Sequence, residues 1–194
     1  MVSLVTDVIL QLAPRLIVNR LNNNYMSRPD LTRVPEWYHR YIAQVEGDDL
    51  ILLLNEQLTS FLFFLENLDA EKREYRYGPD KWTIKEVLQH ILDAERVFAY
   101  RALCIARGEK QPLPGFDENN YVTHSKADKR EWKDMLEEFK AVRYSTTMLF
   151  ASFDEEQLEA TGTASGWTVY VRGIGFIIIG HLNHHLHIIK ERYL

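Results

Sequence analysis

The amino-acid sequence predicts an all-α protein, a four-helix bundle with long crossover connections. Four long stretches place apolar residues three or four positions apart, which is the spacing of a helix that buries one face. Strand signals are nearly absent, because no run of alternating apolar and polar residues is flanked by an Asn-Gly or Asp-Gly turn. At least one connection is long and contains several prolines, so the helices are not all joined as simple hairpins.

Length and composition favour a single domain. The chain has 194 residues, 46% of them apolar, which is enough for one substantial core, and no Ser/Gly/Pro-rich seam divides it. A polar, turn-forming stretch at residues 22–30 separates residues 1–25 from a domain at residues 26–194. We expect residues 1–25 to form an N-terminal extension or an extra helix, and Met26 is a candidate for the natural start.

Charge and cysteine content narrow the range of partners. A net charge of -5 argues against binding nucleic acid through a broad basic face. No uncharged apolar run reaches about 18 residues, so we expect no membrane span. The lone cysteine, Cys104, excludes an internal disulfide and a Cys-rich zinc module. These features fit a protein of the reducing cytoplasm.

The first two helical stretches are marked by their starts and their apolar faces. One follows Pro35 and runs to about residue 68, with a break at residues 47–49 that can divide it in two. The next begins after Thr83, which forms a capping box with Glu86, and ends near residue 108. At 100° per residue, His90 shares a stripe with Val87, Ala94, Val97 and Arg101, so we expect His90 to face inward or to lie at the edge of the core.

Two further helices follow a long loop. Prolines at positions 112 and 114 predict a loop that continues to about residue 126. The third helix is predicted at residues 129–153 and the fourth at residues 168–193, with Gly162 and Gly166 in the connection between them. Inside the fourth helix, Gly173, Gly175 and Gly180 each cost about 1 kcal/mol relative to alanine, which indicates close approach of a neighbouring helix.

The fourth helix also concentrates the histidines. Four of the seven lie in the last fourteen residues of the chain. His181 and His185 are four positions apart, so both imidazoles project from one helix face and can reach one cation. A catalytic metal site typically has three protein ligands and one open position. His90, on the inner face of another helix, is the best third ligand, whereas His184 and His187 point away from His181 by about 60° and 120° and are expected to be bystanders.

The same histidines have a structural explanation. A cluster near a helix C-terminus can be solvated or can complement the helix dipole, and a single inward histidine can be a satisfied core residue. Three observations favour a metal. The fourth helix is strongly apolar around His181, His90 lies on an inward stripe, and buried histidines without a partner would be costly. Residues alone leave both interpretations open.

Several motifs resemble one known family. The run Y-x-Y-G-P-D-K-W-T-I-K-E-V-L-x-H at residues 75–90, P-L-P-G-F-D at residues 112–117 and G-H-x-x-H-H at residues 180–185 are similar to motifs of the DinB-like (DinB/YfiT) metalloprotein superfamily. The resemblance covers most of residues 26–194. It implies a four-helix bundle with a divalent metal, usually zinc or nickel, held by His90, His181 and His185. Residues 1–25 have no counterpart, and Gly173 and Gly175 replace bulkier residues.

The resemblance also implies classes of activity. Similar proteins include metal-dependent hydrolases and thiol S-transferases that use low-molecular-weight thiols such as bacillithiol or mycothiol. At an open metal position either a water or a small thiol can be activated toward a small-molecule substrate. A non-catalytic metal-binding or stress-response protein is the alternative, and a structural bundle that dimerises, with incidental histidines, is a third class. A homodimer is expected from the resemblance and from the abundance of apolar residues for a bundle of this size.

Other polar and aromatic residues receive two interpretations each. Glu86 lies one turn before His90 and is a candidate catalytic residue that orients this ring or acts as general base, or else it only completes the capping box. Asp93 and Glu95 are expected in surface salt bridges, and Cys104 in the core. Trp82 and Trp167 are expected as packing anchors. A set of loop residues either rims the pocket or is solvated: Asp117, Asn120, Tyr121 and His124.

Overall fold

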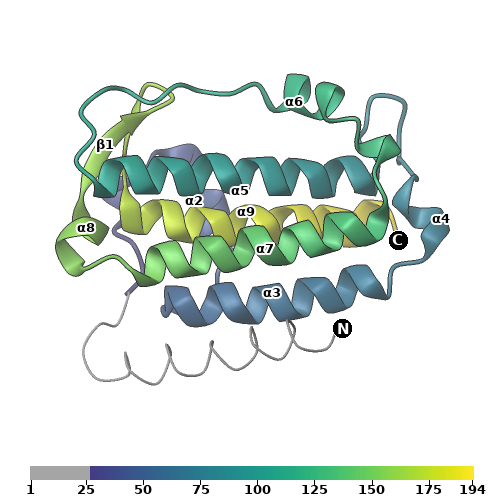
Figure 1. Ribbon diagram of the computed structural model, residues 1–194, viewed down its shortest axis with the longest axis horizontal. Helices are drawn as coiled ribbons and strands as arrows, with labels where there is room; N and C mark the ends of the chain where they lie inside the picture. The colour runs from purple at the N-terminus through teal and green to yellow at the C-terminus, as the bar shows by residue number, and fades with distance from the viewer. Residues whose placement is uncertain (1–26) are drawn as a thin grey trace.

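A computed structural model describes residues 27–194 and confirms the predicted bundle. Four long helices lie nearly side by side, as Figure 1 shows: α3 (Leu50–Glu66), α5 (Ile84–Ala106), α7 (Trp132–Ala151) and α9 (Val171–Arg192). The extension predicted at residues 1–25 lies outside the described residues. None of the helices in residues 27–194 combines the length and apolarity that crossing a membrane requires.

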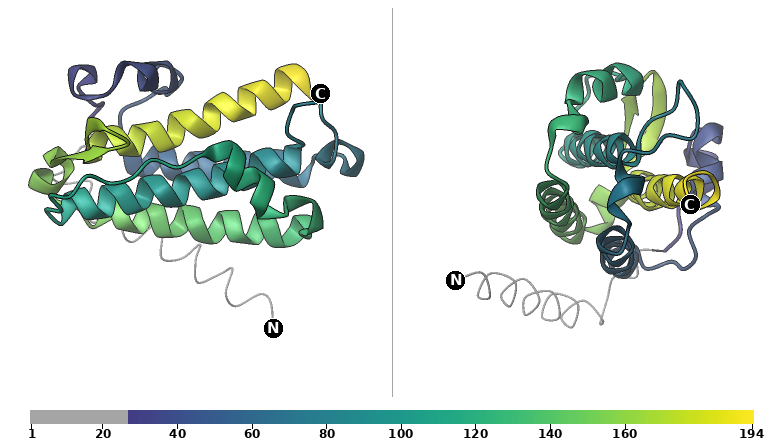
Figure 2. Two further views of the ribbon diagram at one scale, coloured as in Figure 1. Left: turned by 90° about the horizontal axis from the view of Figure 1, so that it is seen from above. Right: turned by 90° about the vertical axis from the view of Figure 1, so that its right-hand side faces the viewer.

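The packing order around the bundle places α5 and α9 next to each other. Helix α5 packs against α7 and α9, and α3 packs against the same two helices from the opposite side. A shorter helix, α2 (Glu36–Ile42), lies outside the four and covers α9 (Figure 2). The remaining helical turns are short: η1 (Leu31–Arg33), α4 (Ala70–Arg73), α6 (Glu118–Ser125), η2 (Ala127–Lys129) and α8 (Glu155–Glu159).

Side-chain caps explain where α3 and α5 begin. Asp49 accepts a hydrogen bond from the backbone N–H of Leu52 and starts α3, just after the break predicted at residues 47–49. Thr83 and Glu86 form the predicted capping box at the start of α5, each side chain accepting from the backbone N–H of the other. These caps satisfy amide groups that would otherwise lack partners at the helix ends.

Two elements differ from the sequence prediction. An antiparallel hairpin, β1 (Thr161–Ala164) paired with β2 (Trp167–Tyr170), occupies the connection before α9, with Thr161 opposite Tyr170. Its turn is Ser165-Gly166, where both residues have positive φ. Because β2 extends to Tyr170, α9 starts at residue 171 and not at 168. The helix α6 forms inside the predicted loop, because Asp117 caps it at Asn120.

The glycines of α9 confirm the predicted close approach of neighbouring elements. A Cβ atom at Gly173 would lie 2.9 Å from side-chain atoms of Val34 and Tyr170, and one at Gly175 would lie 2.5 Å from Leu50. At Gly180 the added atom would meet backbone, 2.2 Å from the carbonyl oxygen of Tyr41. The glycines therefore allow α2 and α3 to pack directly on α9.

Glu95 corrects a further expectation. It does form a salt bridge, but in the core and not on the surface: Glu95 and Arg143 are 2% and 0% exposed, and two parallel hydrogen bonds of 2.8 Å join them. Arg143 also donates to Gln57 on α3 at 2.6 Å, and Gln57 donates to Asn183 on α9 at 2.7 Å. One polar network thus connects all four long helices.

Candidate metal centre

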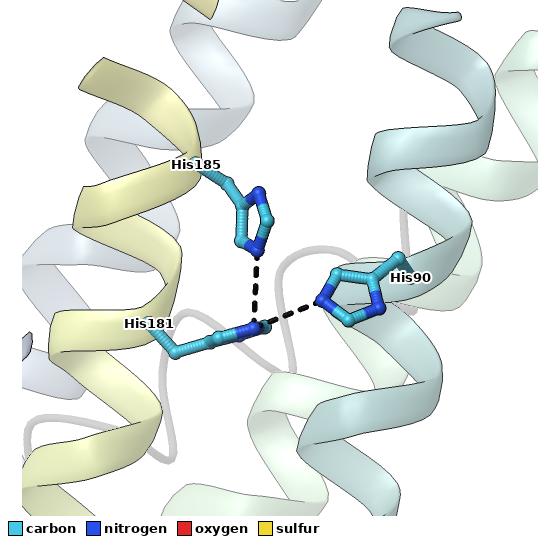
Figure 3. Close-up of side chains that lie close together, drawn as sticks. All are labelled: His90, His181 and His185. Atoms are coloured by element: carbon cyan, nitrogen blue, oxygen red, sulfur yellow. Dashed lines mark hydrogen bonds between the residues drawn. The ribbon is translucent and has the colours of Figure 1, made fainter. Parts of the chain in front are cut away.

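Three histidines from two helices meet between α5 and α9 (Figure 3). The Nε2 atom of His181 lies 3.0 Å from Nε2 of His90 and 3.1 Å from Nε2 of His185. His181 and His185 are one turn apart on α9, and packing of α5 along α9 brings His90 to them. The three residues that the sequence singles out as ligands are therefore in mutual contact.

Burial keeps all three imidazoles neutral. It lowers the pKa of His90 to about 4. Burial, with the charges of His90 and His184 added, lowers the pKa of His185 to about 3. Burial and the neighbouring histidines hold the pKa of His181 well below its usual value. At neutral pH each ring has a free lone pair on one nitrogen, which is the form that binds a metal.

The donor geometry fits a divalent cation better than it fits hydrogen bonding. His181 Nε2 faces two other nitrogens, yet one ring nitrogen has either one proton or one lone pair, so it forms only one good hydrogen bond. A cation instead accepts a lone pair from each ring. Tetrahedral zinc with bonds of 2.0–2.1 Å separates its ligand nitrogens by about 3.3 Å, close to the separations seen here.

Aromatic rings enclose the histidines on several sides. Trp82 lies 4.9 Å from the ring of His90, centroid to centroid, and Phe98 lies 5.8 Å from the ring of His181. Tyr41 of α2 meets His181 at 5.7 Å. Trp82 therefore packs against other residues, as predicted, and one of the residues that it contacts is His90 of the site. Tyr41 was not predicted as part of the site. The sequence feature that could have indicated it is Gly180, because the missing side chain allows α2 to approach α9.

The other two histidines of α9 differ in their distance from this point: the ring of His184 lies 5.3 Å from the ring of His185, whereas His187 faces solvent. His184 packs its ring against Tyr41 at 5.1 Å and is half-buried. His187 is exposed and lies 3.1 Å from Glu191, one turn further on. Neither forms a hydrogen bond with the three-histidine cluster, and their role as bystanders stays a prediction.

Glu86 is engaged at the start of its helix. Its Oε2 accepts the backbone N–H of Thr83 at 2.7 Å and lies 3.7 Å from Arg76. Within residues 27–194, neither Glu86 nor any other carboxylate hydrogen-bonds to the three rings. Capping is the role that its contacts show, and the catalytic role stays a prediction.

The residues of the predicted rim make mostly local contacts. Asp117 caps α6, and His124 lies 2.8 Å from the carbonyl of Asn120 within the same helix. Tyr121 packs on Phe116 at 5.2 Å and is otherwise exposed. None of these contacts reaches the three histidines, so the rim role of these residues stays a prediction.

Comparison with known protein families shows to which family this chain belongs. A sequence profile described as the DinB superfamily matches residues 53–189, which span α3 to α9 and include all three histidines. This chain belongs to the DinB superfamily. Among curated proteins no match was found.

This DinB superfamily chain is also similar to a protein of solved structure. It is YfiT from Bacillus subtilis, described as a probable metal-dependent hydrolase with an unusual four-helix bundle topology. The two share 16% sequence identity and align with a TM-score of 0.65 over 84% of this chain and 90% of YfiT. At that identity the likeness establishes the fold.

Proposed function

We propose that this protein is a metal-dependent enzyme that holds a divalent ion through His90, His181 and His185. The observation that carries the proposal is the convergence of three neutral imidazole nitrogens, from the buried His90 and His181 and the half-buried His185, with His181 Nε2 at 3.0 and 3.1 Å from the other two. Membership of the DinB superfamily and the description of YfiT as a probable metal-dependent hydrolase support it. Imidazole ligands suit zinc and nickel, the two metals expected here.

The reaction class follows from the donor set. A divalent ion held by three neutral ligands keeps its full charge and supplies a Lewis acid that acidifies a bound water or thiol. The protein itself provides neutral ligands and an apolar enclosure built from Trp82, Phe98 and Tyr41. Low polarity around the site strengthens electrostatic interactions within it. We therefore propose hydrolysis or thiol S-transfer on a small substrate.

A thiol for the second reaction would come from solution. Cys104 is half-buried on α5 and packs against the core cluster that contains Phe98 and Phe153. Its place is nearly four turns beyond His90 on the same helix, about 21 Å along the axis, so it does not reach the histidines. The S-transferase version of the proposal therefore requires a low-molecular-weight thiol as co-substrate.

The test is turnover by tag-free protein loaded with zinc or nickel. One panel contains esters and amides, and the other contains small thiols with electrophiles. Activity in one panel that disappears in His181→Ala, while Trp167→Ala on the exposed hairpin retains it, would identify the reaction class. Stoichiometric metal without turnover in either panel would favour the non-catalytic metal-binding alternative, and absence of bound metal would refute both.

A further inference from the structure

Four cationic side chains are buried in the described part of the chain, and three of them have a carboxylate. Arg143 pairs with Glu95, Lys85 lies 2.8 Å from Glu74, and Arg172 pairs with Glu155 and Glu159. Arg101 is 4% exposed and forms no salt bridge within residues 27–194. An unpaired buried charge is costly, so proteins rarely keep one without a partner.

The contacts of Arg101 leave part of its guanidinium free. Its Nη2 donates to the carbonyl of Pro114 and to the hydroxyl of Ser165, both at 2.8 Å. The hydroxyl of Tyr38 is a further side-chain hydrogen-bond partner of the guanidinium. The rings of Phe98 and Phe116 lie 5.9 Å from the guanidinium carbon, and burial lowers the pKa of the group. These three hydrogen-bond partners are all neutral, and a guanidinium has five N–H groups, so donors remain for an anion.

Arg101 and His90 share one face of α5. Eleven residues at 100° each bring the two positions within about 20° of each other, three turns or about 16 Å apart along the axis. Long side chains on a helix point back toward its N-terminus, so the guanidinium extends in the direction of His90. Phe98 lies between the guanidinium and the histidine cluster, because its ring neighbours both Arg101 and His181.

We infer that Arg101 forms an anion-binding subsite, which takes the carboxylate of a small substrate with an apolar or aromatic body. The planar guanidinium can hold a carboxylate through two parallel hydrogen bonds, and Phe98, Phe116 and Tyr38 offer apolar contact to the rest of the molecule. The placement of this substrate's reacting group at the three histidines rests on the proposed function. Binding of the carboxylate by Arg101 does not depend on that function.

The test compares two probes of equal size on the full chain. Benzoate and neutral benzamide are titrated by NMR into metal-free protein at constant ionic strength, so that direct ligation of a metal by the carboxylate is excluded. We expect benzoate to bind and benzamide to bind at least ~10-fold more weakly, since a charge-assisted hydrogen bond contributes that much. Arg101→Gln should remove this preference.

Controls separate the subsite from general charge effects and from folding. Arg107→Gln removes an exposed arginine at the end of the same helix and should leave benzoate binding unchanged. Equal binding of the two probes to the wild-type protein would overturn the inference without any variant. It would also be overturned if benzoate bound only after zinc is added and Arg101→Gln did not weaken it. Absence of metal would refute the proposed function and leave this titration valid.

Discussion

Gly180 of α9 lies directly against the backbone of Tyr41 in α2. A Cβ atom at position 180 would lie 2.2 Å from the carbonyl oxygen of Tyr41, closer than any real contact allows. The ring of Tyr41 in turn covers His181 and His184 at 5.7 and 5.1 Å. One missing side chain next to a histidine of the cluster therefore allows α2 to close over that cluster.

Replacing Gly180 with alanine should displace α2. The added methyl group meets backbone and not a flexible side chain, so the clash can be relieved only by moving a helix, at a cost of about 1–3 kcal/mol. Urea unfolding gives the free energy of Gly180→Ala, and Tyr41 exposure can be followed by solvent quenching in a variant that lacks other nearby tyrosines. Gly78→Ala is the control, because only the flexible side chain of Lys81 approaches that position. Equal stability of the two variants would contradict the close contact.

Metal content should depend on three histidines and not on the other two. We expect His90→Ala, His181→Ala and His185→Ala each to lower bound zinc or nickel from stoichiometric to below about one tenth, because two imidazoles on one or two helices form an incomplete site. Elemental analysis of tag-free protein measures this. His187→Ala is the matched control on the same helix, since it is exposed and paired with Glu191.

Removal of the metal should also lower thermal stability. A ligand that binds only the folded protein stabilises it by about 2.7 kcal/mol at a concentration of 100 Kd. Treatment with a chelator should therefore lower Tm, and adding the metal back should restore it. The same treatment should have no effect on His181→Ala. A Tm that is insensitive to chelation in the wild-type protein would argue against a site made of folded elements.

The buried pair Glu95–Arg143 should be costly to break and less costly to replace. Arg143→Met leaves Glu95 charged and unpaired in the core, where we expect a loss of about 3–5 kcal/mol. Combining it with Glu95→Leu removes the uncompensated charge and should recover much of that loss. Urea unfolding measures both variants. Lys140→Met on the exposed side of α7 should change stability by less than about 0.5 kcal/mol. A double variant no more stable than Arg143→Met would contradict this account.

Helical periodicity explains how much of the site could be predicted. Spacing of four residues places His181 and His185 together, and the inward stripe of α5 contains His90, so all three could be located from sequence. The same stripe gives no information about Glu95, which lies about 140° from His90 on α5. That side of the helix is also buried, because α5 contacts α7 as well as α9. The partner of Glu95 is 48 positions away, and local patterns cannot indicate it.

The hairpin was missed for a related reason. Strands β1 and β2 have four residues each, too short to show alternation, and their turn is Ser-Gly and not Asn-Gly. They are held by contacts with distant residues: Leu113 pairs with the end of β1, and a Cβ atom at Gly162 would lie 2.6 Å from Ile105. Such tertiary contacts override local propensity.

Two carboxylates beside Arg96 should respond to pH in opposite directions. Burial raises the pKa of Asp93, and the hydrogen bond from Gln89 and the charge of Arg96 offset this only in part. Burial acts in the same sense on Glu138, but hydrogen bonds from Arg130 and Arg96 outweigh it and lower its pKa. The Glu138 carboxylate therefore stabilises the fold above its unfolded pKa of about 4.3, and this contribution is lost as pH falls through the lower folded value.

Neutral variants of the two carboxylates test that difference. Glu138→Gln should cost about 1 kcal/mol at pH 7, and the gap from wild type should narrow as the pH falls below the unfolded pKa of about 4.3 and close once it has passed the lower folded value. Asp93→Asn should be neutral or stabilising at pH 7, because the folded state favours the protonated form of this group. Urea unfolding across pH 3 to 8 measures both. A gap for Glu138→Gln that stayed constant down to pH 3 would show that its pairs with Arg96 and Arg130 do not depend on charge.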